Sequence, residues 1–505
     1  MLKFYLRLVL LLLIGTQTSW AQVLNPNDPV VTYNPSSPPS EPTWGQIGKW
    51  VRTQRVSWNS TGYKCYIYKG MQFRLHYPKN FNAADTSKKY PIIIFWHGIG
   101  EKGSKYDNEY QLFHGGQVHD ARIASGAYDG FLLYPQNQFG YWGNTQYDYV
   151  NELINNFFVP QLNVDPFRVM ANGLSGGGAA TWDFMFRFPK LVAGATPISA
   201  AAASYDDNIQ TWKWTSVWHF QGGVDRNPPP AIAQGIEATA KSVGANYKLK
   251  IYPTSGHGIW NTVWNDADYF PFMMRQYKSN PWALYGQTEF CPGATISAVL
   301  GLTAGFDQYQ WRKDGAIISG ATSNTYTATS FGTYDARIRT GTRWSDWSRI
   351  PIVVKAKAPT VTPDITMAGV QSNVLPTPEG KDSVVLSLPE GYASYQWLKQ
   401  GTSDTIGRAS TFAARQPGNY VARVTELFGC SSSLSNPFKV ISATGTPAPD
   451  AANGLIATAL SKTQIKLDWG NKPSPQYNET FFEIYRATSA GGPYTIAAKV
   501  ATDVL

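Results

Sequence analysis

The sequence contains little cysteine, and after its first residues it has no apolar run long enough to cross a membrane. Three cysteines occur in 505 residues, Cys65, Cys291 and Cys430, and they lie far apart. This spacing excludes a disulfide-rich scaffold and a zinc-ligand cluster, and it permits at most one disulfide. Which cysteines pair is left open by the sequence.

The apolar run near the N-terminus is too short for a membrane anchor, which needs about 18 or more apolar residues. Lys3 and Arg7 precede the run, which covers residues 8–14, and a polar stretch that ends at Ala21 follows it. This three-part layout is typical of a secretory signal. We therefore predict a signal peptide over residues 1–21 and a secreted protein without a membrane span.

Charged residues are also sparse, at 15% of the chain, with a positive surplus of +9. Such a surplus would suit an anionic substrate such as a uronate-rich polysaccharide, but more often it only keeps an exported protein soluble. Clusters of His, Cys and carboxylate residues at metal-ligand spacing are absent from the sequence. We expect no metal, no organic cofactor and no nucleic-acid partner.

The first third of the chain divides into a leader and an alternating segment. Residues 22–60 include a stretch rich in Pro, Ser and Asn (25–42), which favours an extended leader. From 61 to 282, apolar runs of strand length alternate with segments of helix length. The expected strands are Ile92–Trp96, Phe131–Tyr134, Arg168–Ala171, Val192–Ser199, Val217–Phe220 and Leu249–Tyr252. This alternation predicts an α/β fold with a doubly wound, mostly parallel sheet.

Past Pro281 the sequence changes to short segments rich in Thr, Ser and Val, with Gly and Pro turns, which is typical of all-β modules. Six residues recur at one constant offset. Tyr309, Trp311, Gly332, Tyr334, Ala336 and Arg337 recur as Tyr395, Trp397, Gly418, Tyr420, Ala422 and Arg423. We predict two immunoglobulin-like sandwiches, over residues 283–356 and 357–443.

The remaining residues, 444–505, carry a pattern typical of a fibronectin type III module. Its apolar positions include Ile465, Leu467 and Trp469. A complete sandwich of this kind needs about 90 to 100 residues. We therefore expect this module to be truncated in the sequence.

The strongest local signal is the five-residue pattern Gly173-Leu174-Ser175-Gly176-Gly177, a GxSxG motif. It follows a predicted strand and precedes an expected helix, Ala179–Phe188. Small residues flank the serine because a sharp strand-to-helix turn leaves no room for side chains. The turn also brings the serine hydroxyl to a helix N-terminus, where backbone N–H groups can bind an oxyanion. We predict Ser175 as a nucleophile.

Six histidines are candidates for the base, and chain order reduces them to two. In hydrolases with this motif the acid and then the histidine follow the serine, which leaves His219 and His257. His219 lies inside an apolar run and is expected to be structural. His257 lies in a glycine-flanked turn after a predicted strand, and we predict it as the base.

The acid is expected after the strand that precedes His257. Asp225 follows Val217–Gly223 almost at once, and we predict that it orients the histidine ring. Asp206 and Asp207 are rivals in an earlier loop, and Asp266 is disfavoured because it follows His257.

The loop after Ile92–Trp96 reads His97-Gly98-Ile99-Gly100-Glu101, and its small residues let backbone N–H groups approach a substrate. By analogy with the HGGG motif, we predict the N–H groups of Ile99 and Gly176 as the oxyanion donors. We expect the serine to attack an ester and form an acyl-enzyme, which water then hydrolyses.

Four stretches of residues 61–282 carry a resemblance to a known family: Tyr90–Gly103, the serine motif with Trp182 downstream, Gly222 and Gly223 before Asp225, and Ser255–Trp260. They resemble the secreted α/β-hydrolase esterases. This group includes polyhydroxybutyrate depolymerases, feruloyl and acetyl xylan esterases, and prolyl-oligopeptidase-like hydrolases. Ile99 departs from the pattern, since relatives often have a smaller residue there, and so does Gly178.

The resemblance implies an esterase that acts on ester groups of a polysaccharide or polyester. It also implies a set of residues along the substrate. These are His97, Gly98, Pro135, Gln136, Trp142 and Trp260. The 18 tryptophans suit stacking on sugar faces and so favour polysaccharide-linked esters, although aromatic residues also fill sandwich cores. As a separate expectation, the β modules contact carbohydrate or a cell surface.

Two other functions stay open. The same triad cleaves amides, so a serine peptidase of prolyl-oligopeptidase-like type is one alternative. The other is a non-enzymatic surface-binding protein in which the hydrolase domain is a relic. The complete set of Ser, His and Asp disfavours the second.

Overall fold

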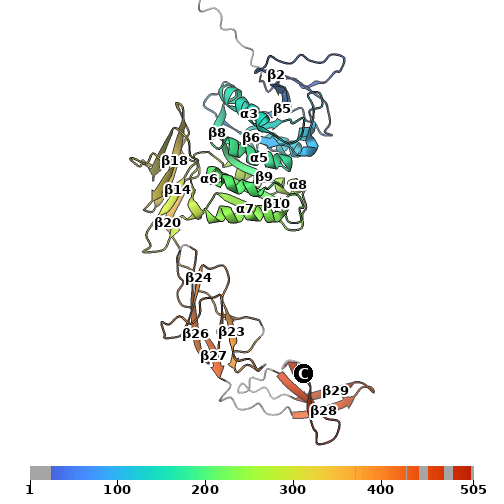
Figure 1. The fold of residues 1–505 in the computed structure, drawn as a ribbon, viewed down its shortest axis with the longest axis vertical. Helices are drawn as coiled ribbons and strands as arrows, with labels where there is room; N and C mark the ends of the chain where they lie inside the picture. The colour runs from blue at the N-terminus through green and yellow to red at the C-terminus, as the bar shows by residue number, and fades with distance from the viewer. Residues whose placement is uncertain are drawn as a thin grey trace, which may run out of the picture. The chain divides into compact units, whose positions relative to one another are not determined.

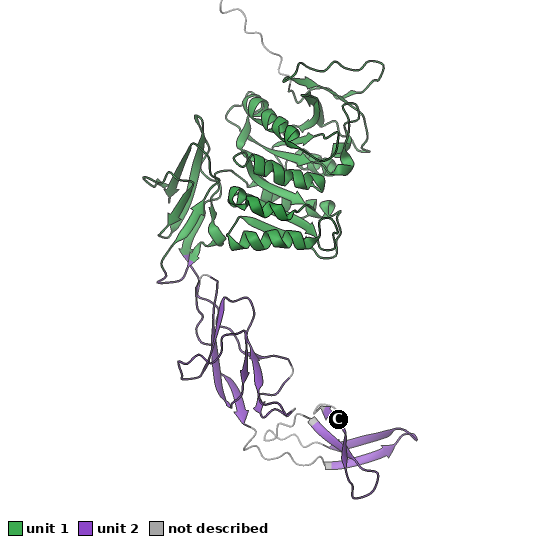
Figure 2. Ribbon diagram, viewed as in Figure 1, with its two compact units in different colours: residues 1–289, 295–355 green, residues 290–294, 356–505 purple. Residues whose placement is uncertain are grey.

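The computed structural model describes residues 24–369, 371–378, 380–427, 429–442, 453–470 and 481–501, so the predicted signal peptide lies outside the described residues. The chain forms two compact units (Figure 2). Unit 1 contains the chain up to Glu289 together with residues 295–355, and unit 2 contains residues 290–294 and the chain from Ala356 onward. Within the described residues, no helix combines the length and apolarity needed to span a membrane.

A nine-stranded sheet forms the centre of unit 1 (Figure 1). Its strands are β2 (Ile47–Lys49), β4 (Tyr63–Tyr68), β5 (Met71–His76), β6 (Tyr90–Trp96), β7 (Phe131–Pro135), β8 (Val164–Leu174), β9 (Val192–Ile198), β10 (Ser216–Gly222) and β11 (Tyr247–Tyr252). They lie in the order β11-β10-β9-β8-β6-β7-β5-β4-β2. The six strands from β11 to β7 are parallel, and β5, β4 and β2 continue the sheet antiparallel. This is the mostly parallel sheet that the sequence predicts.

Helices cover both faces of the sheet, because side chains of buried parallel strands point alternately to each side. The main helices are α2 (Gly116–Ala124), α3 (Asn144–Glu152), α5 (Gly176–Arg187), α7 (Pro230–Ser242), α8 (Trp260–Trp264) and α9 (Tyr269–Met274). On β6, Ile92 and Ile94 belong to the core formed with α3, α5 and α7, which Figure 1 shows over one face. Ile93 and Phe95 belong to the opposite core, with α2, α8 and α9.

Some element boundaries differ from the prediction. β8 begins at Val164 rather than at Arg168, so it also includes Asp165, which the apolar pattern left outside the predicted strand. Helix α5 begins at Gly176 rather than at Ala179, because the three glycines that lower its helix propensity are held by tertiary contacts.

The leader is more ordered than its composition suggests. β1 (Val31–Thr32) pairs with β3 (Val51–Arg52), and β2 joins the central sheet beside β4. Asp28 is buried, accepts a hydrogen bond from Tyr66 and pairs with Lys49 at 2.6 Å. The sequence predicts that the catalytic domain begins at residue 61. The sheet instead begins upstream of that residue, with β2.

Two β modules follow, each built of two sheets. In the first, β12 (Trp282–Ala283), β14 (Ala298–Gly301) and β17 (Thr325–Ala328) form one sheet. The other contains β15 (Gln308–Lys313), β16 (Ala316–Ile317), β18 (Gly332–Thr340), β19 (Arg343–Trp344) and β20 (Ile352–Ala356). In the second module the sheets are β21 (Thr366–Met367), β23 (Val384–Ser387), β25 (Thr411–Ala414), and β22 (Val374–Leu375), β27 (Phe438–Ser442), β26 (Gly418–Thr425), β24 (Ser394–Lys399).

The residues that repeat in sequence occupy equivalent places in the two modules. Trp311 lies opposite Ala336, and Trp397 lies opposite Ala422. Each tryptophan is fully buried and donates its indole N–H to a backbone carbonyl at 2.9 Å. The constant sequence offset therefore reflects one shared strand register.

The last part of the chain is described only in pieces. β28 (Asn453–Ala459) pairs with β29 (Ile465–Gly470), and β30 (Phe481–Arg486) pairs with β31 (Thr495–Ala501). The predicted fibronectin type III module over residues 444–505 lies partly outside the described residues.

The disulfide that the sequence left open joins two distant cysteines. Cys291 is bonded to Cys430, 139 positions later, and both belong to unit 2. Cys65 is a free, buried thiol on β4. Neither repeat contains both partners, which is why no pairing could be read from the repeat itself.

Candidate active site

The predicted catalytic side chains all follow carboxyl ends of parallel strands, where neighbouring strands deliver their loops to one edge of the sheet. Ser175 comes directly after β8, Asp225 three residues after β10 and His257 five residues after β11. The loop with Ile99 follows β6. The fold therefore gathers residues that are up to 158 positions apart, from Ile99 to His257.

Ser175 has a strained backbone, with φ 54° and ψ −123°. A left-handed conformation is rare for a serine and is characteristic of a nucleophile in a strand-to-helix elbow. A Cβ at Gly173 would lie 2.2 Å from Gly177 O, and one at Gly177 would lie 1.9 Å from Trp96 O. The motif needs glycine at both positions because backbone fills the space around the turn.

The three predicted triad members form one hydrogen-bonded chain. The Ser175 hydroxyl donates to His257 Nε2 at 2.9 Å, and His257 Nδ1 donates to Asp225 Oδ2 at 2.9 Å. The side chain of His257 is 38% exposed, whereas that of Asp225 is 1% exposed. A substrate can thus reach the serine and histidine, while the carboxylate is shielded from water.

Asp225 is fixed by more than the histidine. Gln221 donates its amide to Oδ2 at 3.0 Å, and the backbone N–H of Asn227 donates to Oδ1 at 2.9 Å. A Cβ at Gly222 would lie 2.0 Å from Gly256 O, so that glycine lets the loops of the acid and the base run in contact. These contacts hold the carboxylate at the ring nitrogen of His257.

The rival acids interact elsewhere. Asp206 accepts a hydrogen bond from Thr239 on α7, and Asp266 pairs with Lys250 on β11. Asp207 lies in the same turn as Asp206, between β9 and α7. His219 is buried within β10 beside the Tyr247 hydroxyl, and burial lowers its pKa to about 3. Its neutral, enclosed ring is structural, as the apolar run around it predicts.

The two predicted oxyanion donors come close together. A Cβ at Gly176 would lie 2.8 Å from the Ile99 side chain and 3.6 Å from the Ile99 backbone nitrogen. Gly176 is the first residue of α5, so its N–H points away from the helix body and is available to a ligand. In the described residues neither N–H has a protein acceptor. Ile99 is larger than the residue expected in this loop, and its side chain fits because it is 37% exposed and packs over Gly176.

His97 holds the oxyanion loop rather than facing solvent. Its ring is 1% exposed, and burial lowers its pKa to about 4, so it is neutral. Nδ1 donates to Gly98 O at 2.7 Å, and Nε2 accepts from the Asn137 N–H at 3.0 Å. With both nitrogens bound to protein, the ring positions Gly98 and Ile99, so we assign it no direct contact with a substrate.

Gln136 and Trp142 fasten the same loop from the segment that follows β7. Gln136 donates to Glu101 O at 2.9 Å, and the Trp142 indole donates to His97 O at 2.9 Å. Both are buried, and Trp142 also lines a separate hollow of about 440 Å³ with α3 and α5. Gln136 lines a different pocket, of about 370 Å³. Pro135, which ends β7, is buried too.

One pair beside the site was missed by the sequence analysis. The His114 ring donates to Glu101, whose carboxylate is buried in the oxyanion loop. The ring also packs against Trp260 at 5.1 Å between centroids, and Trp260 packs against His257 at 5.9 Å. Glu101 was visible in the glycine-rich loop, but nothing in the sequence links it to a histidine 13 positions later.

No protein-family profile matches the chain, and no curated protein matches it. Several solved structures of esterases show similarity to it. A thermostable esterase is 23% identical with a TM-score of 0.38, and the match covers 43% of this chain and 63% of that one. A feruloyl esterase module from Clostridium thermocellum is 16% identical with a TM-score of 0.35, covering 49% and 96%. Thermogutta terrifontis esterase 2 is 13% identical with a TM-score of 0.33, covering 44% and 94%.

Proposed function

We propose that the chain is a serine hydrolase that cleaves carboxylic esters through an acyl-enzyme. The observation that carries the proposal is the hydrogen-bonded chain from Ser175 through His257 to the buried Asp225. Its order along the sequence, serine then acid then histidine, is that of the α/β hydrolases. Activity, substrate and partners are all part of the proposal.

The mechanism follows from the geometry. As Ser175 Oγ attacks the ester carbonyl, His257 Nε2 takes its proton, and Asp225 keeps Nδ1 protonated. The oxyanion accepts hydrogen bonds from the N–H groups of Ile99 and Gly176. His257 then protonates the leaving alcohol, and a water activated by the same ring releases the acid.

The surface near the site favours an ester carried on a polymer. The pocket of about 370 Å³ that Gln136 lines also includes Trp44 and Phe139. These side chains are 70% and 80% exposed, and Tyr141, two residues after Phe139, is 74% exposed. Exposed aromatic rings stack on sugar or aryl faces. We therefore propose polysaccharide or polyester esters as substrates, with carbohydrate contact by the β modules and secretion as further parts of the proposal.

The test is a substrate panel on the full chain and on Ser175→Ala. It contains p-nitrophenyl acyl esters, feruloylated xylan and a prolyl peptide anilide. We expect ester hydrolysis that Ser175→Ala reduces by about three orders of magnitude or more. Cleavage of the anilide in preference to every ester would instead assign a peptidase, and no hydrolysis of any member would contradict the proposal.

A further inference from the structure

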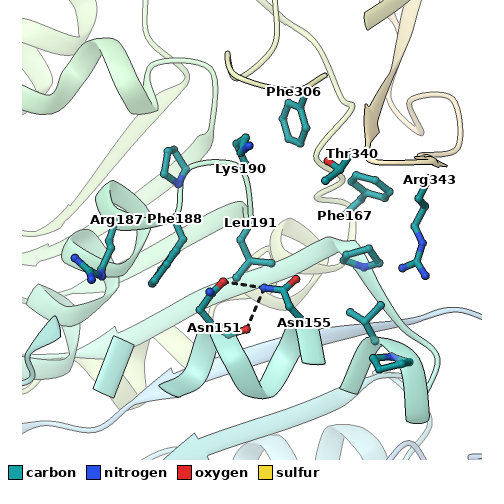
Figure 3. A pocket seen from close by; sticks show the side chains of 14 residues that line it. Asn151, Asn155, Phe167, Arg187, Phe188, Lys190, Leu191, Phe306, Thr340 and Arg343 are labelled. Carbon is teal, nitrogen blue, oxygen red and sulfur yellow. Dashed lines mark hydrogen bonds between the residues drawn. The ribbon is translucent and has the colours of Figure 1, made fainter. Parts of the chain in front are cut away.

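Another pocket, of about 510 Å³, lies in unit 1 (Figure 3). Phe167 stands near the start of β8, and Leu191 immediately precedes β9. These are the amino ends of the strands, whereas Ser175 follows a carboxyl end. Phe306, Thr340 and Arg343 of the first β module close the other side.

The interior of this pocket is mostly apolar, and its two asparagines, Asn151 and Asn155, hydrogen-bond to each other. Phe167, Phe188, Leu191 and Phe306 surround the space in Figure 3, and three of the four are largely buried. Val159 and the prolines 160, 166 and 189 complete the apolar lining. Its volume falls in the range of about 300–1,000 Å³ typical of small-molecule sites, which occur preferentially where two domains meet.

The rim carries positive charge only. Arg187, Lys190 and Arg343 line the pocket, and no carboxylate lines it. Arg187 is held by Asp148 through two hydrogen bonds of 2.7 and 2.8 Å. Lys190 donates to Gly305 O at 3.1 Å and keeps two further N–H donors, since an ammonium has three. Arg343 has no ion-pair partner in the part of the chain that the structure describes.

We propose that this pocket binds a small carboxylic acid with an aryl or alkyl body. The apolar interior takes the body, and Lys190 and Arg343 take the carboxylate. Arginine suits this role because its planar fork donates two parallel hydrogen bonds to a carboxylate. The site is separate from the triad and does not depend on the proposed esterase activity.

Because the acid contacts both the hydrolase segment and the first β module, it stabilises unit 1. A ligand that binds only the folded state raises the unfolding midpoint with its concentration. Binding of the acid in this pocket leaves the turnover of a small soluble ester at Ser175 unchanged.

The test is titration calorimetry of the full-length Ser175→Ala chain with 3-phenylpropionate. We expect one site per chain, with at least tenfold weaker binding of the neutral analogue 3-phenylpropanol and of acetate. The double variant Lys190→Gln with Arg343→Gln should bind 3-phenylpropionate at least tenfold more weakly. Lys241→Gln, which removes an exposed charge from α7, serves as the matched control and should bind normally.

Three results would overturn the proposal. They are no binding of 3-phenylpropionate, equal binding of the acid and its alcohol, or undiminished binding in the double variant. The last result would mean that the acid binds elsewhere, including at the catalytic edge. Both substituted side chains are exposed, so the variants should fold, and their melting without ligand provides the check.

Discussion

The His114 ring donates a hydrogen bond of 2.7 Å from Nδ1 to one carboxylate oxygen of Glu101, while the other oxygen is buried and has no hydrogen-bond partner among the described residues. Glu101 ends the short turn Ile99–Glu101 that carries a proposed oxyanion donor. Through Trp260 the same histidine contacts the ring of His257. The pair thus connects both halves of the site, and we expect it to act in positioning.

Replacing His114 with Phe keeps a ring against Trp260 but removes the hydrogen bond to Glu101. An unsatisfied buried group costs about 1–3 kcal/mol, and we expect kcat to fall about tenfold, which corresponds to about 1.4 kcal/mol. KM should change less, because no contact with substrate is lost. Steady-state kinetics on a soluble ester measure both. His76→Phe is the control, since His76 makes a similar 2.8 Å contact with Asp120, and an equal effect in both variants would contradict a role in positioning.

Two glycine-to-alanine substitutions should act in opposite directions. At Gly177 a Cβ would meet Trp96 O at 1.9 Å and His97 O at 2.6 Å, so alanine should prevent normal folding of the elbow. At Gly235, apart from its chain neighbours and the backbone of α7 itself, no atom of the described residues lies within 4 Å of the Cβ position. Alanine there should stabilise the helix by about 0.5–1 kcal/mol. Urea unfolding of both variants checks this, and a stable, active Gly177→Ala protein would refute the packing described.

Lys278 should make the stability of unit 1 increase as the pH rises above neutrality. Its ammonium is buried against Val192 O at 2.7 Å and Thr215 Oγ1 at 3.0 Å, and burial lowers its pKa to about 7. Between this value and the unfolded pKa of about 10.4, the unfolded chain binds a proton that the folded chain does not. Stability therefore rises with pH across this window, by up to about 1.4 kcal/mol per unit, and is lost as pH falls through 7.

Lys278→Met should abolish that rise. The measurement is the free energy of unfolding of both proteins from pH 6.5 to 10, compared as a difference at each pH. Lys241→Met, on an exposed helix surface, controls for the loss of one charge. If wild type and Lys278→Met run parallel over the whole range, the lysine is not held neutral in the folded protein.

Asp225→Asn should leave the fold intact but lower kcat by up to about 10⁴, because an amide favours the wrong tautomer of His257. Asp206→Asn is the matched control, since Asp206 bonds to Thr239 instead. It should retain normal turnover. If Asp206→Asn lowered kcat more than Asp225→Asn, at unchanged melting temperatures, the assignment of Asp225 as the acid would be wrong.

The proximity of Ser175, Asp225 and His257 could be predicted from sequence because each follows a strand of the parallel sheet and chain order eliminates most rivals. Ser175 needs a glycine-flanked turn, and His257 and Asp225 are the polar residues that follow the next suitable strands. The parallel sheet could be predicted from the alternation of apolar runs with helix-length segments. The repeat of Trp311 and Trp397 could be predicted from a constant sequence offset. Both patterns can be read directly along the sequence.

Interactions between distant loops could not be predicted in this way. The contact of His114 with Glu101 and the bond of Cys291 to Cys430 depend on how loops meet after folding, and neither has a periodic signal. The roles of His97 and Trp142 illustrate the same limit. The resemblance implied contact with substrate, but their hydrogen bonds hold the oxyanion loop.

The most direct measurement of the central claim is covalent labelling of the nucleophile. The full chain is treated with diethyl p-nitrophenyl phosphate, the released p-nitrophenol is counted, and the modified peptide is located by mass spectrometry. Nucleophilic attack by an activated serine predicts one equivalent of p-nitrophenol, a diethyl phosphate on Ser175 and a parallel loss of ester hydrolysis. An unlabelled Ser175 in a protein that still hydrolyses esters, or a label on another residue whose loss abolishes activity, would contradict the account.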